Sequence, residues 1–213
     1  KNNKIKIIWV GRLDREKSFE TLINALNYNF EKKIEVSVLG PGNKDLFKKK
    51  ITLNKNINYK FYGYKKNLQK FFLRSDIYIN TSLYEGFPNA VIQAMNYGLP
   101  VITSRSDGGI LEITNNGEFA TLFVTKQHIE LRKILIDYSL NRAHYKKKAF
   151  AAKINLRKFK FNNVLKFRFP NLSMSVAVSW KNPFIVSHLI LYLYRTQKKF
   201  INVSGINKII AIK

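Results

Sequence analysis

Short apolar runs alternate with amphipathic segments along most of the chain, and this pattern most limits what it can fold into. Strands are expected at residues 5–10, 34–39, 57–62, 77–81, 100–103 and 119–124. Helices are expected at residues 19–27, 45–51, 68–74, 88–97, 110–114, 127–140 and 142–157. Such alternation implies right-handed crossovers and a parallel sheet covered on both faces. The fold class predicted is therefore α/β, a Rossmann-like doubly wound sheet of about six strands.

The pattern ends after about Phe161, so the chain divides into two expected parts. Residues 1–165 would form the Rossmann-like domain, and residues 166–213 would form an irregular C-terminal tail. The length of 213 residues suits one well-buried domain with a small appendage. No run of eighteen apolar residues occurs and no secretory signal opens the sequence, so neither a transmembrane helix nor export is expected.

The formal net charge of +25 admits two interpretations. An acidic partner such as nucleic acid, anionic lipid or a phosphate-bearing substrate would explain it. A/T-rich codon usage would also explain it, because Lys, Asn, Ile, Tyr and Phe are all abundant and lysines occur along the whole chain. Either way, the charge would draw the protein toward an anionic membrane surface. No helix-turn-helix, zinc-finger or single-strand-binding pattern appears, so no specific nucleic acid is expected as a partner.

Cysteine and histidine contents exclude several kinds of site. The sequence contains no Cys, which rules out disulfides, thiolate catalysis and zinc-thiolate centres. The three histidines, His128, His144 and His188, do not have a metal-ligand spacing. We therefore expect neither a metal nor another cofactor.

A basic loop follows the first expected strand. In a doubly wound fold ligands bind beyond the carboxyl ends of the strands. Gly11 permits a tight exit from the strand, and Ser18 is expected to cap the following helix. Arg12 and Lys17 flank that helix start, whose free N–H groups already favour an anion. The loop is either a diphosphate site or merely a solvated charged turn, and the local pattern leaves both open.

A second loop follows the fourth expected strand and carries a carboxylate. Glu85 stands there, and Gly86 would let the backbone approach a ligand closely. Pro88 suits the first turn of the next helix, whose amides could bind phosphate or sugar oxygens. The alternative is an ordinary helix start with Glu85 exposed to solvent.

Together, these loops resemble the C-terminal, nucleotide-sugar-binding domain of glycosyltransferase family 4. The resemblance covers about residues 4–165, and its motifs occur in one order, each near the carboxyl end of an expected strand or along the helix that follows. The matching segments are Gly11-Arg12-Leu13 with Lys17, Leu39-Gly40-Pro41-Gly42, Phe61-Tyr62-Gly63, Glu85-Gly86-Phe87-Pro88, Ala94-Met95 and Gly98-Leu99-Pro100-Val101. Proteins of that family have two Rossmann-like domains and transfer a sugar from a nucleotide donor with retention of configuration.

The resemblance implies roles for individual residues. Arg12 and Lys17 would neutralise the donor's diphosphate in place of a metal ion, and so help the nucleoside diphosphate leave. Glu85 would contact hydroxyls of the transferred sugar. The implied donor-binding residues are Gly11, Gly40, Pro41, Tyr64, Gly86, Phe87, Asn89, Ala90 and Gln93. Of these, Phe87, Asn89 and Ala90 would act through their backbone amides.

Among its departures from the family pattern, two bear most on function. Gln93 occupies a position that is normally acidic and binds ribose hydroxyls, so weaker nucleotide binding is expected. The N-terminal domain that binds most of the acceptor is not among these residues, and without it the acceptor cannot be positioned. The family's acceptors imply a glycan or lipid-linked partner, with a role in capsule or lipopolysaccharide synthesis.

The function expected is therefore that of a donor-binding domain of a glycosyltransferase, incomplete without an acceptor domain. The location expected is cytoplasmic, as a peripheral protein on the inner face of the cytoplasmic membrane. Two alternatives remain open from the sequence. One is a non-catalytic remnant that folds and binds nucleotide weakly, and the other is a basic nucleic-acid-binding protein.

Overall fold

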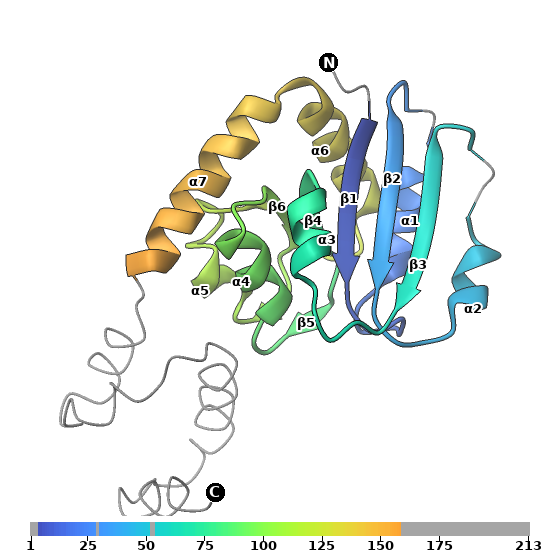
Figure 1. The fold of residues 1–213 in the computed structure, drawn as a ribbon, viewed down its shortest axis with the longest axis horizontal. Helices are drawn as coiled ribbons and strands as arrows, with labels where there is room; N and C mark the ends of the chain where they lie inside the picture. The colour runs from blue at the N-terminus through green and yellow to red at the C-terminus, as the bar shows by residue number, and fades with distance from the viewer. Residues whose placement is uncertain (1–3, 29, 52–53, 159–213) are drawn as a thin grey trace, which may run out of the picture. The chain divides into compact units, whose positions relative to one another are not determined.

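Six parallel strands form the main sheet of the computed structural model, in the order β3-β2-β1-β4-β6-β8. The strands are β1 (Lys4–Val10), β2 (Lys33–Leu39), β3 (Ile57–Gly63), β4 (Ile77–Asn80), β6 (Val101–Ser104) and β8 (Thr121–Phe123). The order reverses at β1, so β4 pairs on the side of β1 opposite to β2 (Figure 1). This is the topological switch point at which doubly wound folds bind their ligands. The predicted fold class is confirmed.

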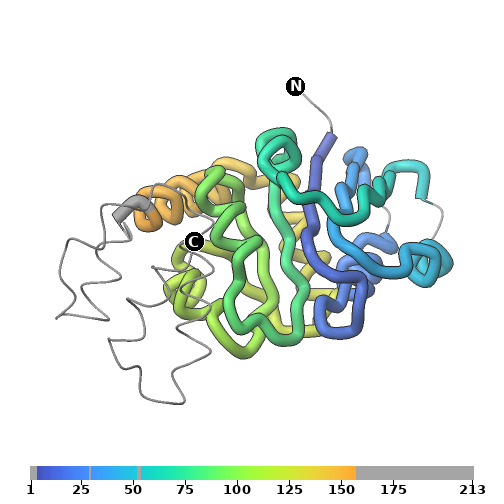
Figure 2. Tube along the Cα trace, turned by 60° about the horizontal axis from the view of Figure 1, so that its bottom comes forward, coloured from blue at the N-terminus to red at the C-terminus, as the bar shows by residue number. Residues whose placement is uncertain are grey.

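Helices cover the sheet in two layers. They are α1 (Phe19–Leu26), α2 (Lys44–Lys48), α3 (Gln69–Arg74), α4 (Asn89–Asn96), α5 (Ile110–Ile113), α6 (His128–Leu140) and α7 (Arg142–Lys158). Helices α1 and α6 pack together behind the sheet in Figure 1, whereas α3 and α4 lie in front of it. The turned view in Figure 2 shows α7 running back alongside α4.

The side chains of β1 explain how one strand serves both layers. Successive residues of a strand point to opposite faces. Ile5, Ile7 and Trp9 therefore enter the core shared with α1 and α6, while Ile8 enters the core shared with α3 and α4. All four are at most 2% exposed, so β1 is buried on both faces, as expected of a central parallel strand.

The structure describes residues 4–28, 30–51 and 54–158, which belong to one unit, Lys1–Lys158. The expected domain boundary at residue 165 and the expected tail at 166–213 lie outside the described residues. Within the described part, no helix is long and apolar enough to cross a membrane.

Two local features differ from the sequence-based expectations. The loop expected at residues 82–87 contains a short strand, β5 (Tyr84–Glu85), which pairs in parallel with β7 (Asp107–Gly108). Ser18 stands at the start of α1 but does not cap it with its side chain. Its backbone is left-handed, with φ of 46°, and its hydroxyl contacts the Thr21 hydroxyl at 2.9 Å instead of a backbone amide.

Candidate active site

The loops after β1, β2 and β3 are bonded to one another at the carboxyl edge of the sheet, the lower edge in Figure 1. The amide of Gly11 donates to the Leu39 carbonyl at 2.9 Å, and the amide of Gly40 donates to the Gly63 carbonyl at 2.9 Å. Leu13 donates to the Pro41 carbonyl at 2.8 Å. Gly11, Gly40 and Pro41, which were expected to line the donor site, therefore lie in two adjoining loops.

Gly40 is required where the first two loops meet. Its φ of +139° is one that L-residues rarely adopt. A Cβ placed on Gly40 would lie 1.8 Å from the carbonyl oxygen of Gly11, which is far inside van der Waals contact. The glycine thus lets two backbones approach at the edge where a ligand would bind.

Lys17 and Glu85 form an ion pair between the β1 loop and the β4 loop. Lys17 Nζ lies 2.8 Å from Glu85 Oε2, and only 17% and 16% of the two side chains are exposed. An ion pair so shielded from water interacts more strongly than a surface pair, because the surrounding dielectric is lower. Lys17 was expected to bind the diphosphate and Glu85 the sugar of one donor, and in this structure the two side chains touch.

Arg12 lies on the same loop as Lys17 but pairs with acids of that loop. Its guanidinium is bonded to Asp14 at 2.9 Å and to Glu16 at 3.1 Å, and 60% of the side chain is exposed. Two carboxylates of its own loop therefore hold Arg12 in this structure. An exposed guanidinium with partners of this kind can exchange them for phosphate at little cost.

The small β5–β7 sheet fixes the backbone of Glu85. Glu85 pairs with Gly108, and the amide of Gly109 donates to the Glu85 carbonyl at 2.9 Å. Gly108 has φ of +103°, and a Cβ there would lie 2.3 Å from the Glu85 carbonyl oxygen. The loop after β6 thus supports the loop that carries the carboxylate, a contact that the sequence did not reveal.

The amides at the start of α4 are not equivalent. Asn89 donates its amide to the Phe87 carbonyl at 2.9 Å, so this N–H is already engaged. Among the described residues, the amides of Phe87 and Ala90 have no acceptor. They remain available at a helix start, beside Gly86, as groups that could bind an oxyanion.

Tyr64 and Gln93 come from two different elements, the loop after β3 and helix α4. Tyr64 follows β3 directly and is 72% exposed, so its ring is free to stack on a planar ligand. Gln93 is half-buried in α4, eight residues after Glu85, and its side chain makes no hydrogen bond to the described residues. Neither residue contacts the Lys17–Glu85 pair in this structure.

A buried polar segment that begins with the last residue of β4 was missed from the sequence. Asn80, Thr81 and Ser82 are at most 4% exposed. Residues 77–81 were expected to form a strand and residues 82–87 a loop, and these polar side chains were given no role. The signal available was the switch from an apolar strand to three consecutive hydrogen-bonding residues.

The charge of Glu85 also affects the pKa of Tyr78. Tyr78 is fully buried in β4, and its pKa is raised far above the ordinary value, chiefly by burial and further by the nearby charge of Glu85. The phenol therefore stays neutral. Within the described part of the chain, no three His, Asp or Glu side chains converge as metal ligands would.

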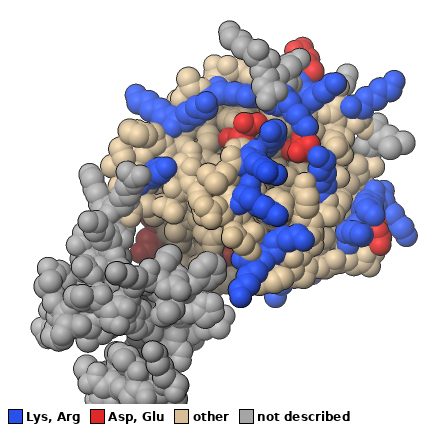
Figure 3. All heavy atoms as spheres, in the orientation of Figure 1, with Lys and Arg blue, Asp and Glu red and all other residues tan. Residues whose placement is uncertain are grey.

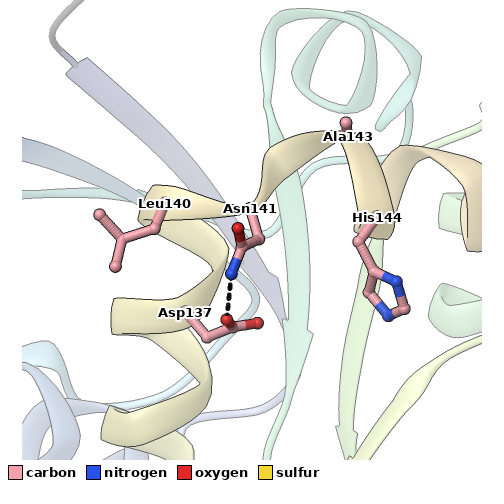
Figure 4. A pocket seen from close by; sticks show the side chains of 5 residues that line it. All are labelled: Asp137, Leu140, Asn141, Ala143 and His144. Atoms are coloured by element: carbon pink, nitrogen blue, oxygen red, sulfur yellow. Dashed lines mark hydrogen bonds between the residues drawn. The ribbon is translucent and has the colours of Figure 1, made fainter.

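A hollow elsewhere on the molecule is unrelated to this edge. It is lined by Asp137, Leu140, Asn141, Ala143 and His144 where α6 meets α7 (Figure 4). It lies at the amino edge of the sheet, since neighbouring Arg142 donates to the carbonyl of Lys4, the first residue of β1. The Tyr145 hydroxyl and then the Asn141 amide hold the pKa of Asp137 below its ordinary value.

The positive charge does not gather over one feature. Figure 3 shows Lys and Arg side chains distributed over much of the face that carries α3, with a few acidic side chains among them. One acidic residue, Glu35 in β2, pairs with Lys4 in β1 and with Lys60 in β3. This distribution agrees with a charge that is spread along the sequence.

Comparison with known proteins identifies the family. Residues 1–154 match the family model described as glycosyl transferases group 1. An uncharacterized 41.2 kDa protein of the cps region of Klebsiella pneumoniae is 26% identical over 148 residues, which cover 68% of this chain and 40% of that protein. The N-acetylgalactosamine-N,N'-diacetylbacillosaminyl-diphospho-undecaprenol 4-alpha-N-acetylgalactosaminyltransferase of Campylobacter jejuni is 27% identical over 151 residues, which cover 67% of this chain and 40% of that protein.

A solved structure shares the fold. The Anabaena protein Alr3699/HepE, solved in complex with UDP and glucose, aligns with a TM-score of 0.63 and 22% identity over 71% of this chain and 43% of its own. The chain thus spans less than half the length of these relatives. The match to the family model covers most of the chain, and the chain belongs to the group 1 family of glycosyl transferases.

Proposed function

We propose that this chain supplies the donor-binding half of a retaining glycosyltransferase of family 4, corresponding to the C-terminal domain of such enzymes. Its substrate would be a nucleoside diphosphate sugar, bound without a metal ion. The observation that carries the proposal is the shielded ion pair of Lys17 and Glu85, formed by two loops at the switch point of the sheet. A cation and a carboxylate so close together suit a ligand whose charged diphosphate adjoins a sugar rich in hydroxyls.

Each group has a task in this proposal. Lys17 has three N–H donors, so it can keep Glu85 and also donate to a phosphate oxygen. Arg12 would leave Asp14 and Glu16 to bind the second phosphate. Both cations would stabilise the charge that develops as the nucleoside diphosphate departs. The free carboxylate oxygen of Glu85 would accept hydrogen bonds from sugar hydroxyls.

The partners proposed are suggested by the relatives. The Campylobacter relative is named for transfer to a diphospho-undecaprenol acceptor, and the Klebsiella relative is encoded in a cps region. By analogy, we propose a glycan or lipid-linked acceptor, bound mainly by a separate acceptor domain, and a role in surface polysaccharide synthesis. A lipid-linked acceptor would place the protein on the inner face of the cytoplasmic membrane. The charge of +25 would favour contact with anionic lipids there.

Calorimetric titration of the full chain with UDP-glucose, UDP-N-acetylgalactosamine and GDP-mannose tests the proposal. At least one of them should bind, and Lys17→Ala should weaken that binding about tenfold or more because a charge-assisted contact to phosphate is lost. Arg12→Ala should weaken it less, since Arg12 is exposed and must first leave its own partners.

Lys4→Ala is the matched control. Lys4 also forms an ion pair with a glutamate, at 2.6 Å, but it stands at the opposite end of β1. Its loss removes the same charge from the chain and should leave nucleotide affinity unchanged within about twofold. If none of the nucleotide sugars binds, or if both lysine variants weaken binding equally, the proposal is wrong.

A further inference from the structure

Thr81 links the β1 strand to the backbone of Lys17. Its hydroxyl accepts a hydrogen bond from Trp9 Nε1 at 3.0 Å and donates one to the carbonyl oxygen of Lys17 at 2.8 Å. Thr81 and Trp9 are at most 1% exposed. Because the indole N–H can only donate, the direction of this chain of bonds is fixed, and it ends on the residue that provides the cation.

Ser82 holds the other member of the ion pair. Its hydroxyl lies 2.9 Å from Glu85 Oε2 and 2.8 Å from Asn80 Oδ1, and the residue has no exposed surface. A hydroxyl has one proton, so it can donate to only one of these acceptors at a time. The charged carboxylate is the stronger acceptor, which favours the bond to Glu85.

The support of these two residues extends into the neighbouring strand β6. The Ser104 hydroxyl donates to the Ser82 carbonyl at 2.5 Å, and the Asn80 amide donates to the Thr103 hydroxyl at 3.0 Å. Thr103 and Ser104 are fully buried. The segment after β4 is thus bonded to β6 on one side and to the β1 loop on the other.

We infer that Thr81 and Ser82 are positioning residues that hold the two members of the Lys17–Glu85 pair at fixed places for the donor. Thr81 fixes the backbone that carries the cation, and Ser82 fixes the carboxylate. The inference rests on the proposed function, in which Lys17 binds the diphosphate and Glu85 binds the sugar. Neither hydroxyl needs to touch the ligand.

The physical reason is that lysine and glutamate have long side chains with many rotamers. Ordering such a side chain costs conformational entropy, and ordering it before the ligand arrives removes that cost from binding. Charged groups held in place also stabilise developing charge better than groups that must reorient. Two consecutive buried residues achieve this for both charges at once.

The two residues should have different effects on two ligands, which allows a sharp test. Calorimetry on the full chain would compare UDP with UDP-glucose and GDP with GDP-mannose. Ser82→Ala should weaken the sugar nucleotide about tenfold and change the affinity for the free nucleotide by less than about twofold, because only the sugar meets Glu85. Thr81→Val should weaken both ligands about equally, because both carry the diphosphate that meets Lys17.

Matched variants separate positioning from loss of stability. Thr81→Ser keeps the hydroxyl and should restore affinity to within about threefold of the parent. Thr114→Val removes an equally buried hydroxyl whose bond, at 2.8 Å, goes to the Ile110 carbonyl in α5. Ser75→Ala removes a hydroxyl bonded to the Phe71 carbonyl at 2.8 Å, before β4 begins. Neither control should alter the binding of either ligand.

A double-mutant cycle on the ligand-free protein tests the contact between Ser82 and Glu85 without any ligand. Urea unfolding of the parent, Ser82→Ala, Glu85→Gln and the double variant should show non-additive losses, with a coupling of about tenfold in the unfolding equilibrium constant. Additive losses would overturn the inference, as would an equal effect of Ser82→Ala on free and sugar-bearing nucleotides. A parent that binds no nucleotide would overturn the proposed function instead, and the cycle would still decide whether Ser82 holds Glu85.

Discussion

The molecule has one lysine–glutamate ion pair at the carboxyl edge of the sheet and another between strands β1 and β2. The two pairs differ in their surroundings. At the carboxyl edge, Lys17 and Glu85 are 2.8 Å apart with 17% and 16% of their side chains exposed. Lys4 and Glu35 are 2.6 Å apart with 37% and 15% of their side chains exposed, and Lys60, 46% exposed, gives Glu35 a second cation at 3.0 Å. Distance alone would rank the second pair higher.

What distinguishes the carboxyl edge is the framework behind the charges. Glu85 is fixed through its backbone by Gly109 and through its carboxylate by Ser82, whereas the carboxylate of Glu35 is bonded only to two partly exposed lysines among the described residues. A pair with fixed, buried supports can serve as a preorganised site, whereas a carboxylate held only by partly exposed lysines contributes mainly to local order. The two pairs therefore differ in their supporting bonds more than in charge or distance, and the supported pair is the one proposed to bind the donor.

The largest effect expected comes from the glycine at which two loops meet. Gly40→Ala should lower the free energy of unfolding by about 4 kcal/mol, because the new Cβ would overlap the Gly11 carbonyl and the backbone conformation is unfavourable for alanine. Gly63→Ala is the control, since φ there is +65° but, apart from its chain neighbours, no atom of the described residues lies within 4 Å of the new Cβ. It should cost about 1 kcal/mol, from backbone strain alone. Equal losses in urea unfolding would show that the close approach of Gly40 to the Gly11 carbonyl does not add to the cost.

The two lysines provide the direct test of the difference between the pairs. Lys17→Ala leaves a poorly exposed carboxylate without its cation, and should lower the free energy of unfolding by about 2 kcal/mol. Lys4→Ala leaves Glu35 with Lys60 and should lower it by about 0.5 kcal/mol. Urea unfolding at neutral pH measures both values. A smaller loss for Lys17 than for Lys4 would contradict the difference drawn between the two pairs.

The sequence predicted the sheet and the loops better than it predicted the contacts among them. Short apolar runs bounded by turn residues report buried strands directly, so the six strands were located to within a few residues. The contact of Glu85 with Ser82 is local, but the pairing of Glu85 with Gly108 joins residues whose proximity depends on the crossover through α4. Arg12 illustrates a different limit, because nearby acids compete for a cation and the sequence does not say which acid prevails.

A change at Gln93 tests the proposed contact between α4 and the ribose. Gln93→Glu should raise the affinity for nucleotide about tenfold, because a carboxylate accepts hydrogen bonds from ribose hydroxyls more strongly than an amide does. Asn96→Asp adds the same charge to the exposed far end of α4 and should change affinity by less than about twofold. Calorimetry with the nucleotide that binds best would measure both. An unchanged affinity in the Gln93 variant would mean that this helix position does not face the ribose.

The smallest effect expected concerns Glu35, the acid that pairs with Lys4. Hydrogen bonds from Lys4 and then Lys60 lower the pKa of Glu35, so folding favours its charged form. The stabilisation is therefore present above the pKa of glutamate in the unfolded chain, about 4.3, and is lost as the pH falls through the lower pKa of the folded state. Relative to Glu35→Gln, the parent should be more stable by about 0.5 kcal/mol from about pH 7 down to about 5, and this advantage should disappear at lower pH.

Urea unfolding across this pH range measures the difference in stability. Because the lysines are partly exposed, added salt should reduce the difference at about pH 7. An advantage that grows as the pH falls would show that the charge of Glu35 destabilises the folded state. The ion pair of Glu35 with Lys4 would then not be weakly stabilising.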